Sequence, residues 1–304
     1  MILLKQMLIL FFFMIIGYLM GKKKIIDEKV SGSLSWMIVN ITNPALILSG
    51  GISAEMDRDE LLKTFALAAG MFALLILFSE IITPLFRFEK KEAGVYKALM
   101  VFSNMGFMGF PIISALYGEE ALVYASVFLL PFNVLVYTYG VFCISGHRMD
   151  VRRAAREFCN IGTCAGVVAL ILAVSRFRLP DIVNQTIEML SDLTAPLCMM
   201  VIGTAFLNIR FKDVFCNLKL MLFSVIRLLI IPLAGMMVIR LVTSDPVLQG
   251  ICFIILASPA GSMIAMLAQQ NNGNYLIASE GAAVTTLFSV VTMPLLFQMI
   301  GLNV

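Results

Sequence analysis

Long apolar stretches separated by short polar interruptions occupy most of this chain of 304 residues. They lie at about residues 2–21, 33–50, 61–86, 98–117, 121–144, 158–175, 182–207, 220–242, 247–268 and 275–301. A helix needs about 20 apolar residues to cross a bilayer. Only 13% of the residues are charged, against about 25% in soluble domains. We therefore expect an all-α polytopic membrane protein with ten transmembrane helices. A soluble enzyme, a nucleic-acid binder and a secreted disulfide module are excluded.

Cysteine and histidine give no sign of a metal site or a disulfide framework. The six cysteines show no C-x-x-C spacing, and most of them lie inside apolar stretches. Buried free thiols are therefore the expected state. His147 stands alone beside Arg148 in a polar loop, without partners for a zinc site or a catalytic triad. We expect no cofactor and no metal ion.

The distribution of basic residues predicts the orientation in the cell (inner) membrane, because cytoplasmic loops carry an excess of Lys and Arg. With the N-terminus outside, fifteen of the 22 basic residues fall in cytoplasmic loops and six fall outside. Both termini are then outside, and the basic loop 146–157 is cytoplasmic, where it contacts anionic membrane lipid. The cytoplasmic residues are Lys22, Lys23, Lys24, Lys29, Arg87, Lys90, Lys91, Lys97, Arg148, Arg152, Arg153, Arg156, Arg210, Lys212 and Lys219.

Ten alternating helices divide into two halves of five, and the odd number gives the halves opposite orientations. Such inverted repeats are common among secondary transporters. We expect a first repeat in residues 1–145, a loop in 146–157 and a second repeat in 158–304. Features recur at matching places in the two halves: Gly17/Gly21 and Gly162/Gly166, Pro44 and Pro196, and the interruptions Asn104–Pro111 and Ser258–Gly261.

The fourth and ninth apolar stretches are interrupted near their centres by glycine and proline, which weaken or break a helix. The freed backbone groups cannot face lipid, so they line a cavity or pack against protein. Each interruption starts a new half-helix, and two helix N-termini meeting at the midplane favour an anion such as a carboxylate. Two ordinary proline kinks are the alternative. The residues expected at this site are Asn104, Pro111, Ser258, Pro259, Gly261 and Ser262.

Three ionisable residues, Glu80, Arg227 and Glu280, lie inside apolar stretches at similar depth. Such residues are costly in a membrane unless they are paired or hydrated, so they are candidates for function. Pairing with one another would make them structural, whereas protonation of a glutamate would couple protons to transport. Asp59 and Lys63 begin the third stretch at a spacing that puts them on one helix face.

Several segments resemble the auxin efflux carrier family. Its bacterial members include carriers for malate and malonate, and its plant members are the PIN-type auxin exporters. Asn104–Pro111, followed by Ala115–Gly118, is similar to the family's N-x-x-x-x-G-x-P…YG segment. Asp192–Pro196 with Ile202-Gly203 resembles the seventh-helix segment, and Ala257–Gln269 resembles the ninth. The resemblance covers essentially the whole chain.

The resemblance implies a fold similar to the bile-acid sodium symporter type. Helices 1, 2, 6 and 7 would form a scaffold and a homodimer interface, and helices 3–5 and 8–10 would form the moving domain. It also implies that the two broken helices cross at the substrate site, that Asn133 lies near a polar position there, and that Asp59 and Lys63 support transport. The large cytoplasmic loop of many plant members is absent here.

These observations favour a secondary transporter that moves a small organic anion by elevator-like alternating access. An anion channel is one alternative. A membrane-embedded enzyme is another, but the lone histidine and the absence of a midplane carboxylate pair argue against it. The sequence leaves open the substrate, the direction of transport, and whether protons, sodium ions or neither drive it.

Overall fold

The computed structural model describes residues 2–53, 55–86, 88, 90–145, 161–175, 177–208, 217–271 and 273–302. Within these ranges the regular structure is helical, apart from one isolated antiparallel bridge between Ser103 and Ala260. Six of the described helical runs are long and apolar enough to cross a membrane, and shorter apolar helices accompany them. The chain is therefore a multi-span, all-helical membrane protein. The six runs are Leu4–Lys22, Arg58–Leu85, Ala121–Ser145, Asp181–Ala205, Leu218–Val242 and Tyr275–Ile300.

In the first half, helical segments follow the predicted apolar stretches in order, with π-helical turns (η) inside several runs. These segments are α1 (Ile2–Lys22), α2 (Glu28–Met37), η1 (Ile38–Thr42), α3 (Asn43–Ser53), α4 (Arg58–Leu85), α5 (Lys90–Val101), η2 (Met105–Gly109), α6 (Phe110–Tyr117), α7 (Ala121–Leu135), η3 (Val136–Gly140) and α8 (Val141–Ser145). An Asp57–Glu60 capping box starts α4 by satisfying backbone N–H groups of its first turn.

The second half is also helical in the described ranges. Its segments are α10 (Ile161–Ser175), α11 (Asp181–Asp192), α12 (Thr194–Ala205), the 3₁₀ turn η4 (Phe206–Asn208), α14 (Leu218–Val225), η5 (Ile226–Ile230), α15 (Ile231–Val242), α16 (Pro246–Ala257), α17 (Met263–Gln270) and α18 (Tyr275–Ile300). Asp245 caps α16 by accepting from the N–H groups of Val247 and Leu248, and Gly301 ends α18 in a left-handed conformation.

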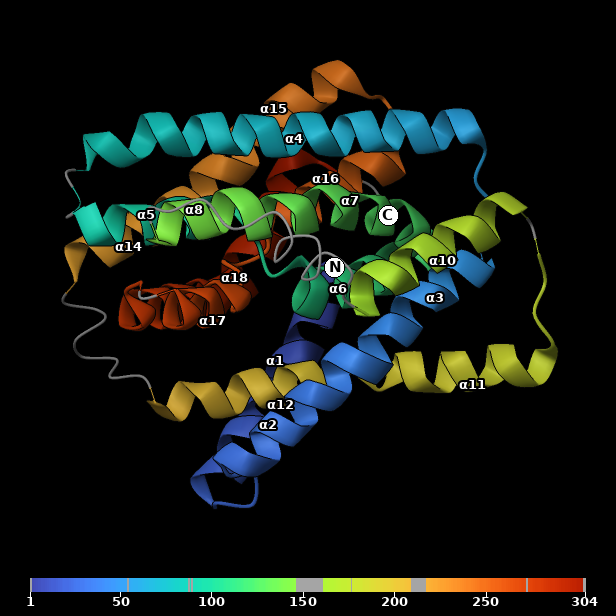
Figure 1. The fold of residues 1–304 in the computed structure, drawn as a ribbon, viewed down its shortest axis with the longest axis horizontal. Coiled ribbons are helices and arrows are strands. Elements are labelled where there is room, and N and C mark those ends of the chain that lie inside the picture. The colour runs from blue at the N-terminus through green and yellow to red at the C-terminus, as the bar shows by residue number, and fades with distance from the viewer. Residues whose placement is uncertain are drawn as a thin grey trace.

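The helices form two groups that meet along one side (Figure 1). Helices α1, α2, α3, α10, α11 and α12 occupy the lower and right-hand part of that view, here called the lower helix group, and α4 and α15 lie at the upper edge. Within the lower group α1 packs along α12, and α3 packs along α10 and α11. Each of these pairings joins one helix from the first half to one from the second. The broken helices lie between the lower group and the upper edge.

Glycines allow the close approach of α1 and α12. A Cβ atom at Gly17 would overlap the backbone of Met200, and one at Gly203 would overlap the backbone of Met14. A Cβ at Gly21 would meet Leu207 of the same chain. Gly17 and Gly21 are therefore used inside one subunit and give no argument for a second copy, so the homodimer stays a prediction.

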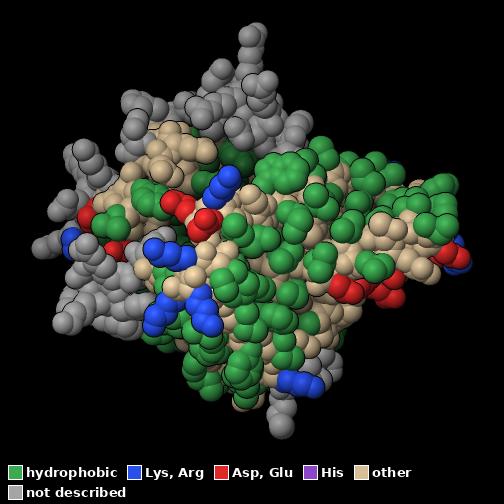
Figure 2. Space-filling model, turned by 90° about the horizontal axis from the view of Figure 1, so that it is seen from below, with side chains coloured by type: hydrophobic (Ala, Val, Ile, Leu, Met, Phe, Trp, Pro, Cys, Tyr) green, Lys and Arg blue, Asp and Glu red, His purple; other side chains and the backbone are tan. Residues whose placement is uncertain are grey.

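The outer surface suits a lipid environment. In Figure 2 hydrophobic side chains cover much of the visible face, and most charged side chains lie toward its two ends. Large exposed apolar side chains such as Phe12, Leu77 and Leu241 belong to different helices. Such a surface would be unfavourable in water and is expected against hydrocarbon.

Several basic residues that the sequence assigns to loops lie in helices. Lys22 ends α1, Lys29 lies in α2, and Lys97 lies well inside α5, which begins at Lys90. The apolar stretch begins only at residue 98 because the first two turns of α5 are polar. The basic loop 146–157, with His147, lies outside the described residues. The described cysteines Cys143, Cys164, Cys198 and Cys252 are free thiols.

Candidate functional site

The two interruptions lie against each other. The backbone N–H of Asn104 donates to the carbonyl oxygen of Pro259 at 2.8 Å, and the N–H of Gly261 donates to the carbonyl oxygen of Phe102 at 2.9 Å. These two bonds flank the antiparallel bridge between Ser103 and Ala260. Each break therefore satisfies backbone groups that the other break has freed, as a buried backbone requires.

Local sequence explains why α16 stops at this place. Pro259 has no N–H group, so the helix of α16 cannot continue through it, and Ser258 takes an extended conformation. A Cβ at Gly261 would come within 3.2 Å of the carbonyl oxygens of Phe102 and Ser103. Glycine at position 261 thus lets the two chains approach closely enough to form the bridge.

A new helical segment begins on the far side of each break. The carbonyl of Asn104 accepts from the N–H of Met108, which starts η2 and then α6, and Ser262 precedes α17. The N-terminal turn of a helix presents unpaired N–H groups and partial positive charge. Both segments begin at the crossing, so the polarity there favours a bound anion.

Asn104 supplies a side chain suited to such an anion. Only 6% of its surface is exposed, and its side-chain amide makes no hydrogen bond within the described ranges. Its amide atoms are not among the fully buried side-chain atoms that lack a partner, so they stay accessible, and the NH₂ group can donate to a carboxylate. Asn104 is therefore the strongest of the predicted site residues.

The sequence analysis missed Asn43, at the start of α3. Its amide nitrogen lies 3.8 Å from where a Cβ of Gly106 would be, next to η2, and its amide oxygen is buried without a hydrogen-bond partner. The hydroxyl of the preceding Thr42 is also buried without a partner. The Asn43-Pro44 dipeptide was the available signal, but only Pro44 was used. The lower helix group thus presents polar atoms toward η2.

Other predicted residues support the crossing through packing. The hydroxyl of Ser258 donates to the carbonyl of Ile254 at 2.6 Å, and its oxygen lies 3.5 Å from where a Cβ of Gly109 would be. Pro111 is buried at the start of α6. Ser262 is exposed, and its hydroxyl makes no cap to α17. Among the predicted serines, Ser262 is therefore the one accessible at the break.

Asn133 of α7 forms a hydrogen bond to α10. Its amide donates to the hydroxyl of Thr163 in α10 at 2.7 Å, and only 6% of its surface is exposed. The neighbouring Phe132 contacts Phe102 edge to face, with ring centroids 5.6 Å apart. Asn133 therefore lies one residue from a side chain that packs on the break.

Thr285 of α18 was not predicted and contacts the break directly. Its hydroxyl oxygen accepts from the N–H of Ala260 at 3.1 Å and donates back to the carbonyl of Gly281. This contact satisfies the backbone N–H of Ala260, which has no helical acceptor because the helix is interrupted between α16 and α17. A threonine 25 residues away carries no local sequence signal for this role.

The charged residues inside the apolar stretches do not all pair with one another. Glu80 forms an ion pair with Lys97 and accepts from the hydroxyl of Tyr139 at 2.8 Å. Arg227 is 1% exposed and donates to the carbonyl oxygen of Leu256 at 2.7 Å. Glu280 is half-buried in α18. Glu80 and Arg227 thus have different partners, and the choice between a structural and a coupling role for these residues stays open.

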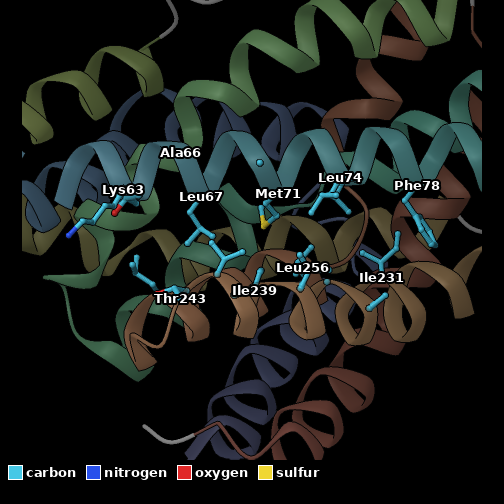
Figure 3. A pocket seen from close by; sticks show the side chains of 18 of the residues that line it. Lys63, Ala66, Leu67, Met71, Leu74, Phe78, Ile231, Ile239, Thr243 and Leu256 are labelled. Carbon is cyan, nitrogen blue, oxygen red and sulfur yellow. The ribbon is translucent and has the colours of Figure 1, made fainter. Parts of the chain in front are cut away.

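Asp59 and Lys63 lie on the exposed first turns of α4, and the described atoms form no ion pair between them. Lys63 instead borders a groove of about 840 Å³ between α4 and α15. Figure 3 shows Leu67, Met71 and Phe78 of α4 facing α15 along this groove. Its lining is mainly apolar, with Glu60, Lys63 and Asp245 among the few charged residues. The groove lies between α4 and α15, and Leu256 near the end of α16 also lines it.

Comparisons with known proteins agree with this architecture. A family model described as "Membrane transport protein" matches residues 2–157 and 152–297. An uncharacterized transporter of Methanocaldococcus jannaschii is 23% identical over 304 residues, covering 95% of this chain and 96% of the relative. An uncharacterized transporter of Methanothermobacter thermautotrophicus is 24% identical over 295 residues, covering 92% and 93%. The resemblance to the auxin efflux carriers is thereby confirmed, and the chain belongs to the membrane transport protein family.

Proposed function

We propose that this membrane transporter is a secondary carrier that moves a small organic carboxylate, with the substrate held at the crossed breaks. The main support is the side-chain amide of Asn104, which has no hydrogen-bond partner among the described residues and lies beside the backbone bond to Pro259. Two helical segments begin at the same place, so a carboxylate would receive charge-assisted hydrogen bonds there. A cation would meet the same donors and be disfavoured.

We further propose ten membrane crossings arranged as two inverted halves, with alternating access produced by motion between the two helix groups. The pairing of α1 with α12 and of α3 with α10 supports this arrangement. In ten crossings, α1 is the first, α3 belongs to the second, α10 is the sixth and α12 belongs to the seventh. The pairing of the first with the seventh is then the symmetric counterpart of the pairing of the second with the sixth. A pseudo-two-fold axis of the kind that relates inverted repeats in carriers would produce such matched pairings.

The orientation has both termini outside and residue 150 in the cytoplasm. Single cysteines at residue 150 and near each terminus can be labelled in intact cells with a membrane-impermeant thiol reagent. Labelling of residue 150 only after the cells are permeabilised is expected. Labelling of that residue in intact cells would reverse the orientation.

A homodimer through the lower helix group is also proposed, on the family resemblance alone. Light scattering in mild detergent and in lipid nanodiscs measures the mass of the particle without its lipid. A mass of two chains is expected in both media. A single chain in both would remove the dimer from the proposal while leaving the substrate site in place.

The deciding experiment for the function is uptake into liposomes that contain the purified protein. The panel includes monocarboxylates, dicarboxylates and hydroxy acids, each compared with its neutral amide. Gradients of pH and of sodium are varied independently, because the driving ion is not specified by the proposal. Saturable uptake with counterflow of a carboxylate, and none of its amide, is expected. Unitary currents without counterflow would identify an anion channel instead.

A further inference from the structure

Arg227 is the largest of the fully buried side chains in the described structure and lies in η5. Its Nη1 atom donates to the carbonyl oxygen of Leu256 at 2.7 Å, whereas its Nε atom is buried without a partner. An arginine remains charged in proteins, and a buried charge is costly unless it is compensated. Within a membrane such a residue is a candidate for function.

The partner of Arg227 belongs to the break. In an unbroken helix the carbonyl of Leu256 would accept from the N–H of Ala260, four residues later. That N–H donates instead to the hydroxyl of Thr285 at 3.1 Å. The carbonyl of Leu256 therefore lies at the C-terminal end of α16, where the helix dipole is negative. Arg227 supplies both the missing donor and an opposing charge.

The crossing contains two helix C-termini as well as two N-termini. The C-terminal ends of α5 and α16 would repel an anion that the N-termini attract. At the end of α5, the carbonyl of Phe102 accepts from the N–H of Gly261. At the end of α16, the guanidinium of Arg227 binds the carbonyl of Leu256. Of the two helix C-termini, the end of α16 therefore has a positively charged side chain bound to it, whereas the end of α5 has a neutral backbone N–H.

We propose that Arg227 sets the charge selectivity of the crossing by cancelling the negative end of α16. A bound anion then experiences the positive N-terminal turns with less opposition from the carbonyl ends. This inference rests on the proposed function and deepens it, because it assigns the preference for anions to one residue. Arg227 acts through the helix terminus and need not touch the substrate.

The test measures the electrostatic potential at the crossing without any substrate. The full-length protein, with its six native cysteines replaced by alanine, receives Ser262→Cys, because Ser262 is exposed at the break. The rates of reaction with a negatively charged and a positively charged methanethiosulfonate reagent are then measured in liposomes. Their ratio, divided by the ratio for free mercaptoethanol, reports the local potential. The parent is expected to favour the negative reagent.

Arg227→Gln removes the charge but keeps a donor, and it should shift this ratio about tenfold toward the positive reagent, as expected for loss of a nearby charge. Arg227→Lys should keep most of the preference. Arg240→Gln is the matched control. Arg240 lies farther along the same helical run and donates to the carbonyl of Ile300, but it is exposed at the helix end. It should leave the ratio unchanged.

Melting curves identify which variants are folded. An unchanged ratio in folded Arg227→Gln would overturn the role of Arg227. If carboxylate uptake persists in that variant, the proposed function stands without it. If Arg227→Gln does not fold, the parent protein still tests the proposal. A ratio of reagent rates in the parent equal to the ratio for free mercaptoethanol would contradict a charge selectivity set by Arg227. If Arg227→Gln shifts the ratio as expected but the parent takes up no carboxylate of the panel, the proposed substrate is wrong and the role of Arg227 stands.

Discussion

Asn104 and Pro259, 155 positions apart in the chain, are joined by a backbone hydrogen bond of 2.8 Å. The bond uses the backbone N–H of Asn104 and so leaves its side-chain amide for another partner. Pro259 has no N–H group and interrupts α16, and its carbonyl oxygen accepts the bond. One pair of residues thus closes the crossing and leaves a donor inside it.

The first prediction is that Asn104→Ala weakens substrate binding without unfolding the protein. A lost hydrogen bond to a charged group is worth about 1.5–3 kcal/mol, or roughly ten- to a hundredfold in affinity. Asn104→Asp should be worse, because it adds a negative charge where an anion binds. Binding of the carboxylate selected by the uptake panel is measured by calorimetry with the purified variants.

Asn271→Ala is the control for these variants. Asn271 lies at the far end of α17 and donates to the carbonyl of Leu267 within its own helix. It should bind the carboxylate as the parent does. If Asn104→Ala and Asn104→Asp are stable and also match the parent, the breaks are packing kinks and the proposed substrate site is wrong.

A second prediction concerns the contact between Thr285 and the break. Thr285→Val removes the oxygen that accepts from the N–H of Ala260 and leaves a buried donor unpaired. The expected loss is about 1–3 kcal/mol in the free energy of unfolding. Thr285→Ser keeps the oxygen and should recover most of it. Thermal unfolding in one detergent measures both variants.

The adjacent Thr286→Val is a close control. The hydroxyl of Thr286 donates to the carbonyl of Ala282 in its own helix, and Thr286 is nearly as buried as Thr285. This substitution leaves no backbone N–H without a partner, so it should change the melting temperature little. Equal losses in Thr285→Val and Thr286→Val would show that the contact with Ala260 contributes nothing specific.

The breaks were predictable from sequence because proline and glycine act locally. Pro259 and Gly261 mark the second interruption whatever the rest of the chain does. The first was predicted at Asn104–Pro111 but lies between Val101 and Met105, and Pro111 is inside the helical run that follows it. The partners that complete the crossing could not be predicted in this way. Thr285 resembles any other threonine in an apolar helix, and Asn43 gains its position only when α3 packs beside η2. Tertiary contacts, not local preferences, select these residues.

The same limit applies to charges and glycines. Lys97 precedes the apolar stretch directly, so hydropathy assigned it to a loop, whereas the polar first turns of α5 continue the helix. Its pairing with Glu80 then follows from the packing of α5 against α4. The Gly17–Gly21 spacing correctly predicts a close helix contact. It cannot say whether the partner helix belongs to the same chain.

A third prediction tests the contact between α1 and α12. Gly203→Ala would place a methyl group into the backbone of Met14, and such overpacking costs about 1–3 kcal/mol. Gly70→Ala in α4 is the control, because a Cβ there has open space. It should be neutral or stabilise the protein by about 0.5–1 kcal/mol, the helix preference for alanine. Thermal unfolding compares the two, and similar behaviour of both would contradict the close packing.

The last prediction separates a structural role for Glu80 from proton coupling. Glu80 pairs with Lys97 and also accepts from Tyr139, whose hydroxyl is shared with Ser79. The pair is partly exposed, with 44% of the Glu80 side chain accessible, so it should contribute only about 0.2–1 kcal/mol. Glu80→Gln and Lys97→Met should each lower the melting temperature slightly.

The double variant decides whether the two losses have one cause. If the ion pair is the cause, the melting temperature of the double variant should be no lower than that of the less stable single variant. The reason is that the stability losses of two residues in contact do not add. Uptake by Glu80→Gln, measured with and without a pH gradient, should keep the dependence on pH seen in the parent. Loss of that dependence with an unchanged melting temperature would make Glu80 a coupling residue, and its pairing with Lys97 would then be secondary.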